Sequence, residues 1–109
     1  MRRGEVWWAN LPQPSGRRPV LLLSRDAAYA RRASITVAPV TRTSRGIPVE
    51  VSLSPADGMP VPCVVNTDDI VTIPKALIQE RITFLSRDKM QEVARAIVFA
   101  LDLGPDLDG

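Results

Sequence analysis

Short apolar runs, separated by proline, glycine and polar residues, fill the first 85 residues of the chain and constrain its fold more than any other feature. Residues 20–23 are four consecutive aliphatic residues, which is typical of a strand covered on both faces. Residues 11–16 contain two prolines and a glycine, which cannot lie inside a paired ladder and predict a loop. Strands are expected at residues 5–10, 18–25, 35–40, 49–53, 61–66 and 70–73, with a last strand near Ile82.

The pattern changes after Leu85, where apolar residues follow helical spacing and Ser86 can cap the first turn. Gly104 and Pro105 are expected to end this helix. The apolar stripe consists of Met90, Val93, Ala94, Ile97, Val98 and Leu101. A mainly β fold with α follows: a strongly bent sheet or partly open barrel of about six or seven short strands, closed on one side by the C-terminal amphipathic helix. The stripe covers either the barrel of its own chain or a dimer interface, and the sequence does not separate the two.

The length of 109 residues predicts a single domain over residues 1–104, followed by a disordered tail at 105–109. No apolar stretch approaches the roughly 20 residues that span a bilayer, and the charged start lacks a signal-peptide apolar region. A cytoplasmic protein without membrane contact is therefore expected. The single Cys63 cannot form an internal disulfide, and it is interpreted as a small buried apolar residue.

Charge is distributed unevenly along the chain. Residues 1–45 hold nine arginines and two carboxylates, a net charge of +7, whereas the remainder holds five basic and ten acidic residues, a net charge of −5. Arginine suits forked contacts with phosphate. The first half therefore predicts nucleic-acid binding, although a solvated basic surface would have the same composition.

Two basic segments are joined directly to the predicted core strands. Arg17 and Arg18 precede the aliphatic run at residues 20–23, and Thr41, Arg42 and Arg45 follow the strand at 35–40. A rigid sheet can hold guanidinium and hydroxyl groups at its strand ends against a phosphate. These residues are therefore candidates for a phosphate-binding site.

Several enzyme classes are excluded by what the sequence lacks. There is no histidine, which removes nucleases with paired imidazoles and hydrolases that depend on histidine. Asp68 and Asp69 are adjacent and would point to opposite faces of an extended chain, so no metal site and no cofactor are expected. RNA can supply its own 2′-hydroxyl as the nucleophile, which leaves orientation and charge stabilisation to the protein. DNA lacks that hydroxyl and would be spared.

Nearly the whole chain resembles the MazF/PemK toxins, a family of metal-independent endoribonucleases from bacterial type II toxin–antitoxin systems. The resemblance depends on the order and spacing of several motifs. They are Arg3-Gly4-Glu5-Val6-Trp7; Gly16-Arg17-Arg18-Pro19-Val20-Leu21 with Ser24; Thr41 with Ser44, Arg45, Gly46 and Pro48; Asn66-Thr67-Asp68 before Thr72-Ile73; and the Leu85-Ser86 helix start. The family implies an SH3-like barrel that forms a homodimer, with RNA in a shared groove and a cognate MazE-like antitoxin as inhibitor.

The resemblance also assigns roles to individual positions. Arg18 matches the family's catalytic arginine, and Thr41 matches its catalytic hydroxyl. The implied products carry a 2′,3′-cyclic phosphate and a 5′-hydroxyl. Asn66 and Asp68 match polar positions that contact RNA or assist cleavage, although some relatives have arginine in place of Asn66. Ser24 belongs to the same motif, where a strand-end hydrogen bond is the simpler role.

Other interpretations remain open at this point. Arg17 either contacts phosphate or is only solvated, and Arg42 and Arg45 either contact phosphate or are turn residues. Glu50, Lys75 and Arg81 are interpreted as surface charges. Trp7 and Trp8 should point to opposite faces of their strand, and one of them is a candidate for stacking on a base. A non-enzymatic poison of DNA gyrase, as in the related CcdB-type toxins, is the main alternative function. A silent RNA-binding module is the second.

Overall fold

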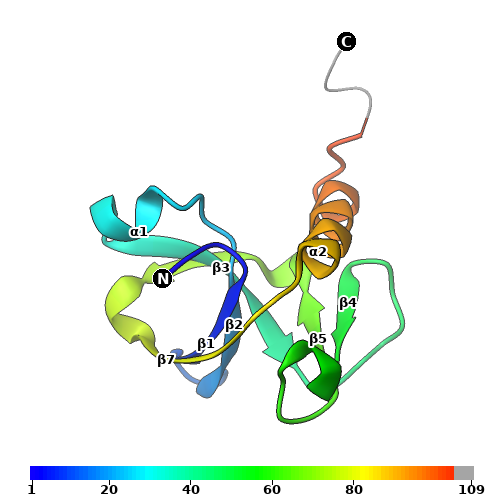
Figure 1. Ribbon diagram of the computed structural model, residues 1–109, viewed down its shortest axis with the longest axis horizontal. Helices are drawn as coiled ribbons and strands as arrows, with labels where there is room; N and C mark the ends of the chain where they lie inside the picture. The colour runs from blue at the N-terminus through cyan, green and yellow to red at the C-terminus, as the bar shows by residue number, and fades with distance from the viewer. Residues whose placement is uncertain (105–109) are drawn as a thin grey trace.

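The computed structural model describes residues 1–104 as a seven-stranded antiparallel sheet with a long C-terminal helix (Figure 1). This confirms the predicted fold class. The sheet is open, because the strand order β4-β5-β3-β2-β1-β7 leaves β4 and β7 as edges, with β6 paired to β3. The strands are β1 (Glu5–Asn10), β2 (Arg17–Leu22), β3 (Ser34–Thr41), β4 (Glu50–Leu53), β5 (Cys63–Asn66), β6 (Val71–Pro74) and β7 (Ile78–Phe84). The helices are α1 (Ala28–Arg31) and α2 (Arg87–Ala100), with 3-10 turns η1 (Pro55–Asp57), η2 (Thr67–Asp69) and η3 (Lys75–Leu77).

Strand β3 is the hinge of the bent sheet. One of its edges pairs with β2, while the other pairs with β6 over Ser34 to Val37 and with β5 at Val40 and Thr41. The strands β4 and β5 therefore diverge from β1, β2 and β7, and α2 lies against β4 (Figure 1).

Both faces of the central strands are buried, as the aliphatic run at residues 20–23 predicts. Leu21 and Leu23 belong to the core beneath α2, whereas Val20 and Leu22 belong to a second core that includes Ala28 and Tyr29 around α1. The alternation follows from the period of two along a strand. Two cores on opposite faces hold β2 rigidly in the middle of the molecule.

Strand β2 ends at Leu22, short of the predicted residue 25. The Ser24 side chain replaces the backbone ladder there, because its Oγ accepts a hydrogen bond from the Thr36 N–H at 2.8 Å. The Ser24 carbonyl accepts another from the Tyr29 hydroxyl, also at 2.8 Å. The chain then turns into the short helix α1.

Helix α2 begins as predicted, with Ser86 Oγ accepting a hydrogen bond from the Lys89 N–H at 3.1 Å. Its predicted end at Gly104 is wrong. Asp102 adopts a left-handed φ of 55°, and the N–H groups of Asp102 and Leu103 bond back to the carbonyls of Phe99 and Val98. This pattern closes the last turn without glycine. The tail predicted at 105–109 lies outside the described residues.

The apolar stripe of α2 is also only partly correct. Val93 is fully buried, and Met90 and Ile97 pack partly against the core. Ala96 is buried in place of Ala94, and the remaining apolar side chains of this region face outward. The exposed side chains are Ala94, Val98, Phe99, Leu101 and Leu103. Within residues 1–104, no helix has the length and apolar character needed to cross a membrane.

Candidate active site

Arg18 and Thr41 lie at the same end of the sheet, on neighbouring antiparallel strands. The paired stretch of β2 and β3 ends at Val20 and Pro39, and Arg18 and Thr41 each lie two residues beyond this last pair. Residues two apart along a strand share a face, so both side chains are on the face of Val20 and Pro39. The sheet therefore juxtaposes the two residues to which the resemblance assigns catalysis.

Two pockets meet at this pair and share Arg18, Thr41 and Thr43 as lining residues. The larger one, here called the apolar pocket, has a volume of about 570 Å³. Its wall combines Trp8, Arg17 and Arg42 with an apolar segment formed by Met59, Pro60, Val61 and Cys63. The smaller one, the polar pocket, has a volume of about 250 Å³ and is lined also by Arg45, Glu50, Asn66 and Asp69. A phosphate bound at Arg18 would therefore adjoin both pockets.

Hydrogen-bond donors remain available at the pair. The Thr41 Oγ1 accepts a hydrogen bond from the Thr43 N–H at 3.3 Å, so its own O–H proton is left to donate to a ligand. Arg18 is half-buried, and within residues 1–104 its side chain makes one hydrogen bond, from Nε to the Ser15 carbonyl at 3.4 Å. No carboxylate of the described chain lies within ion-pair distance of Arg18, which leaves its guanidinium free for an anion.

The loop at residues 42–49 is held against the polar pocket by Glu50. One carboxylate oxygen, Oε1, accepts hydrogen bonds from the N–H groups of Arg45 at 2.8 Å and Gly46 at 3.0 Å. The Ser44 hydroxyl lies 3.5 Å from the same oxygen. Charge-assisted bonds of this kind fix a loop more firmly than neutral ones. The sequence suggests only a surface charge at Glu50. Its position shortly after a glycine-containing turn was the signal that its carboxylate could bind the backbone N–H groups of that turn.

The conformation of the turn η2 determines which of the predicted polar residues line the polar pocket. Asn66 Oδ1 accepts a hydrogen bond from the Asp68 N–H at 2.9 Å, and Asn66 Nδ2 donates to Asp69 Oδ2 at 2.9 Å. The buried Thr67 fastens the turn, because its hydroxyl donates to the Val49 carbonyl at 2.6 Å. Asn66 and Asp69 therefore line the polar pocket. Asp68 is exposed and lines neither pocket.

The other predicted residues are divided between the pockets and the scaffold. Arg42 lines the apolar pocket and Arg45 the polar pocket. Arg17 also lines the apolar pocket, but its guanidinium carbon lies 4.3 Å from the centre of the Trp8 ring. Ser24 is at the opposite end of β2 and lines neither pocket; its Oγ serves the hydrogen bond to Thr36 described above.

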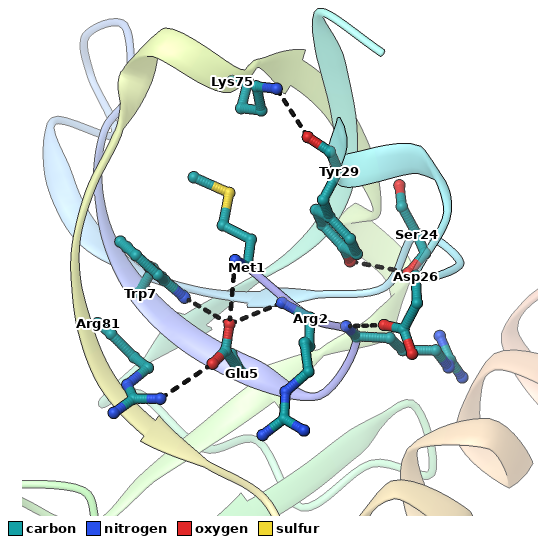
Figure 2. Close-up of polar contacts among 10 residues, drawn as sticks. Met1, Arg2, Glu5, Trp7, Ser24, Asp26, Tyr29, Lys75 and Arg81 are labelled. Carbon is teal, nitrogen blue, oxygen red and sulfur yellow. Dashed lines mark hydrogen bonds and ion pairs between the residues drawn. The ribbon is translucent and has the colours of Figure 1, made fainter. Parts of the chain in front are cut away.

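The neighbouring tryptophans point to opposite faces, as predicted. Trp8 lines the apolar pocket, whereas Trp7 packs against the core around α1 and donates its indole N–H to Glu5 Oε1 at 3.2 Å. Glu5 is only 4% exposed, and its Oε2 lies 3.1 Å from Arg81 Nη1 (Figure 2). Arg81, which the sequence suggests is a surface charge, is thus part of the scaffold.

Two buried groups, Glu5 and Cys63, have pKa values shifted in opposite directions. Desolvation would raise the pKa of Glu5, but hydrogen bonds from the Arg2 N–H, Arg81 and Trp7 outweigh it and hold that pKa below its ordinary value. Burial raises the pKa of the Cys63 thiol, and the nearby Asp57 adds to this effect. Cys63 is 8% exposed, which confirms its interpretation as a buried residue. Among residues 1–104, no group of three or more Cys, Asp or Glu side chains is placed to hold a metal ion.

The chain is thus a small, open antiparallel sheet in which Arg18 and Thr41 line two adjoining pockets. Residues 2–101 match the profile of the family described as the PemK-like, MazF-like toxin of type II toxin–antitoxin systems. The chain belongs to this family.

Relatives and solved structures agree with this assignment. The chain is 41% identical over 98 residues to the probable endoribonuclease MazF2 of Mycobacterium tuberculosis, covering 89% of this chain and 94% of the relative. Among solved structures, the Mycobacterium tuberculosis toxin MazF-mt6 superposes with a TM-score of 0.85 at 34% identity, over 92% of this chain and 98% of that one. A mycobacterial endoribonuclease in complex with its cognate antitoxin superposes with a TM-score of 0.84 at 27% identity, over 95% and 97%. These relatives support the endoribonuclease function and not the gyrase-poison alternative.

Proposed function

We propose that the protein is a metal-independent, sequence-selective endoribonuclease toxin that cleaves single-stranded RNA in the cytoplasm. The observation that carries this proposal is that Arg18 and Thr41 lie at the same end of two neighbouring strands and line the same two pockets. The pockets suit two consecutive nucleotides, and the pair between them suits the phosphate that joins these nucleotides. The endoribonuclease names of the relatives support the same activity.

The reaction uses the 2′-hydroxyl of the RNA as its nucleophile, which is why the substrate must be RNA and no metal is required. The 2′-oxygen forms a bond to phosphorus, the bond from phosphorus to the 5′-oxygen breaks, and the leaving oxygen takes up a proton. The guanidinium of Arg18 and the hydroxyl of Thr41 donate to the non-bridging oxygens as charge builds on them. The products carry a 2′,3′-cyclic phosphate and a 5′-hydroxyl.

The polar pocket supplies groups that can assist the attack. Two carboxylates, those of Glu50 and Asp69, line it together with Arg18 and Thr41. A carboxylate within reach of the 2′-hydroxyl can accept its proton. Asn66 orients Asp69 through the 2.9 Å hydrogen bond, so we assign Asn66 a positioning role. Asp68 lies outside both pockets and is at most a contact to flanking RNA.

A cognate MazE-like antitoxin would inhibit the enzyme, as the solved complex of a mycobacterial endoribonuclease with its antitoxin suggests. The N-terminal 45 residues carry a net charge of +7, which favours an acidic partner. A disordered acidic segment can fold onto such a surface and block the groove.

A homodimer is part of this proposal. The helix α2 exposes Val98, Phe99 and Leu101 to solvent, with Phe99 at 61% exposure. The neighbouring strand β4 is a free edge of the sheet. Exposed apolar patches beside an unpaired edge are typical of protein interfaces.

The test is incubation of the purified protein with a long RNA and a DNA of matched sequence in the presence of a chelator. We expect cleavage of the RNA alone, 5′-hydroxyl ends, and a shared sequence at the cut sites. Arg18→Ala and Thr41→Val should lower the rate by about 100-fold and about 10-fold, because each removes a donor to the phosphate. Arg31→Ala, an exposed arginine that lines neither pocket, is the matched control.

Two other results would contradict the proposal. Cleavage by Arg18→Ala at the wild-type rate would remove the pair from catalysis. Binding of RNA without cleavage, weakened by Arg18→Ala, would instead identify a silent RNA-binding module.

A further inference from the structure

Arg17, Trp8 and Glu80 form a row across three neighbouring strands at the mouth of the apolar pocket. The register pairs Trp8 of β1 with Pro19 of β2 on one side and with Glu80 of β7 on the other. Arg17 is two residues from Pro19 and therefore lies diagonally across from Trp8 on the same face, within reach of a long side chain. The row is dictated by register, not by a flexible loop.

The guanidinium of Arg17 is held on two sides. Its carbon lies 4.3 Å from the centre of the Trp8 ring, and its Nη2 lies 3.9 Å from Glu80 Oε2. Cation–π stacking and an ion pair both restrict a side chain that otherwise has many rotamers. The Arg17 side chain nevertheless remains 51% exposed and lines the apolar pocket. It thus presents a planar surface, backed by an indole, to that pocket.

Another part of the pocket wall is apolar. Met59, Pro60, Val61 and Cys63 line it, and Met59 and Cys63 are buried. A volume of about 570 Å³ lies in the range of small-molecule sites, which combine apolar walls with a few polar groups. A planar, weakly polar group fits between such a wall and a guanidinium plane better than a phosphate does.

We propose that the Arg17–Trp8 stack is a nucleobase-binding subsite. One base next to the scissile phosphate leaves the RNA stack, enters the apolar pocket and lies on the free face of the Arg17 guanidinium, as unstacked RNA bases do on arginine planes. Arg17 then contacts a base and not a phosphate, while Arg18 serves the phosphate. This inference rests on the proposed endoribonuclease function and names a subsite of it.

The test is a coupling measurement between protein and RNA. A short RNA containing the mapped cut sequence is prepared intact and with an abasic ribose at each position beside the cut. For the wild-type enzyme we expect one abasic position to lower kcat/KM by about 10- to 100-fold, the usual size of a base–aromatic stacking effect. Arg17→Lys keeps the charge and removes the plane, so it should lower kcat/KM on intact RNA and make that abasic position nearly neutral. Arg31→Lys, an exposed arginine outside both pockets, should behave as wild type.

Trp8→Leu provides a second variant, because it removes the support of the guanidinium without changing Arg17. It should show the same loss of coupling at the same position. Circular dichroism and thermal melting of each variant separate a local effect from misfolding.

Three outcomes would overturn the subsite. In the first, Arg17→Lys keeps wild-type activity, whereas Arg17→Ala lowers the rate equally on every abasic RNA. If Arg17→Ala also lowers the slope of log affinity against log salt concentration by about one, Arg17 binds phosphate. If no abasic position couples to Arg17 or Trp8, the pocket holds no base. If the variants change only inhibition by the antitoxin, the stack belongs to a protein interface.

Failure of the proposed function has a different signature. If the wild-type protein cleaved no RNA, that function would be lost, but stacking would still be measurable in the Trp7→Phe variant, where Trp8 is the remaining tryptophan. The subsite would be supported if a single-stranded heptauridine quenched the Trp8 fluorescence and an abasic heptamer did not. Equal signals from both probes would reject it.

Discussion

Arg18 and Arg81 lie on different strands of the same sheet, but their surroundings are opposite. Arg81 Nη1 lies 3.1 Å from the buried carboxylate of Glu5, in a cluster where Trp7 and the Arg2 N–H also donate to that carboxylate (Figure 2). Arg18, by contrast, makes a single 3.4 Å hydrogen bond to a carbonyl within residues 1–104 and faces two pockets. An arginine that neutralises an internal carboxylate stabilises the fold, whereas one without an acidic partner is available for a ligand.

The largest expected effect comes from replacing each of these two arginines, in turn, by glutamine. Arg18→Gln should lower the rate of RNA cleavage by about 100-fold while changing the free energy of unfolding by less than about 0.5 kcal/mol. Arg81→Gln should do the reverse, with cleavage near the wild-type rate and a loss of about 1 kcal/mol, because the Arg81 side chain is 57% exposed and partly screened. Cleavage kinetics measure the rate, and urea unfolding at the same protein concentration measures the stability. If the two variants lost rate and stability to similar extents, Arg18 and Arg81 would not differ in role.

Removal of the buried carboxylate is expected to have the next largest effect. Glu5→Gln keeps the shape of the side chain but loses its charge, and it turns one acceptor toward Arg2, Trp7 or Arg81 into a donor. We expect a loss of about 2 kcal/mol in the free energy of unfolding, equivalent to a fall in Tm of roughly 10 °C for a domain of this size. The cleavage rate of the folded fraction should not change. Differential scanning calorimetry measures the shift, and a Tm within about 2 °C of wild type would contradict it.

The same carboxylate gives the stability a defined pH dependence. The pKa of Glu5 in the folded protein lies below its ordinary value of 4.5, so ionised Glu5 contributes stability above that value. The contribution is lost as the pH falls from 4.5 through the lowered pKa, because the unfolded chain then binds the proton first. The stability difference between wild type and Glu5→Gln should therefore shrink over this acid range. Urea unfolding at several pH values measures it, and a constant difference would exclude Glu5 as its source.

Much of the fold and the position of the central pair are predictable from local patterns. The strand alternation, the Ser86 cap and the burial of residues 20–23 on both faces depend on residues close in sequence. Arg18 and Thr41 meet because one precedes a core strand and the other follows the neighbouring antiparallel strand, which brings both to one end of the sheet. The roles of these two residues stay predictions until they are measured.

The features that sequence analysis missed depend on contacts between distant segments. Asp69 reaches the polar pocket and Asp68 does not, because a 3-10 turn replaces the extended chain at this point. The stack of Arg17 on Trp8 requires the register between β1 and β2. Helix α2 has apolar residues on two faces, and its packing against β4 and η2 determines that Val93 and Ala96 are the buried ones. Periodicity alone cannot choose between such faces.

Ser24 lies just beyond the other end of β2, far from Arg18, and its substitution has the smallest expected effect. Its Oγ accepts the Thr36 N–H at 2.8 Å, whereas its carbonyl, which accepts the Tyr29 hydroxyl, is backbone and survives substitution. Ser24→Ala should therefore cost about 1 kcal/mol in the free energy of unfolding, the usual price of one unpaired backbone N–H. Cleavage should remain within about twofold of wild type, because Ser24 lines neither pocket. A tenfold loss of cleavage at unchanged stability would place Ser24 in the site after all, and both ends of β2 would then serve the RNA.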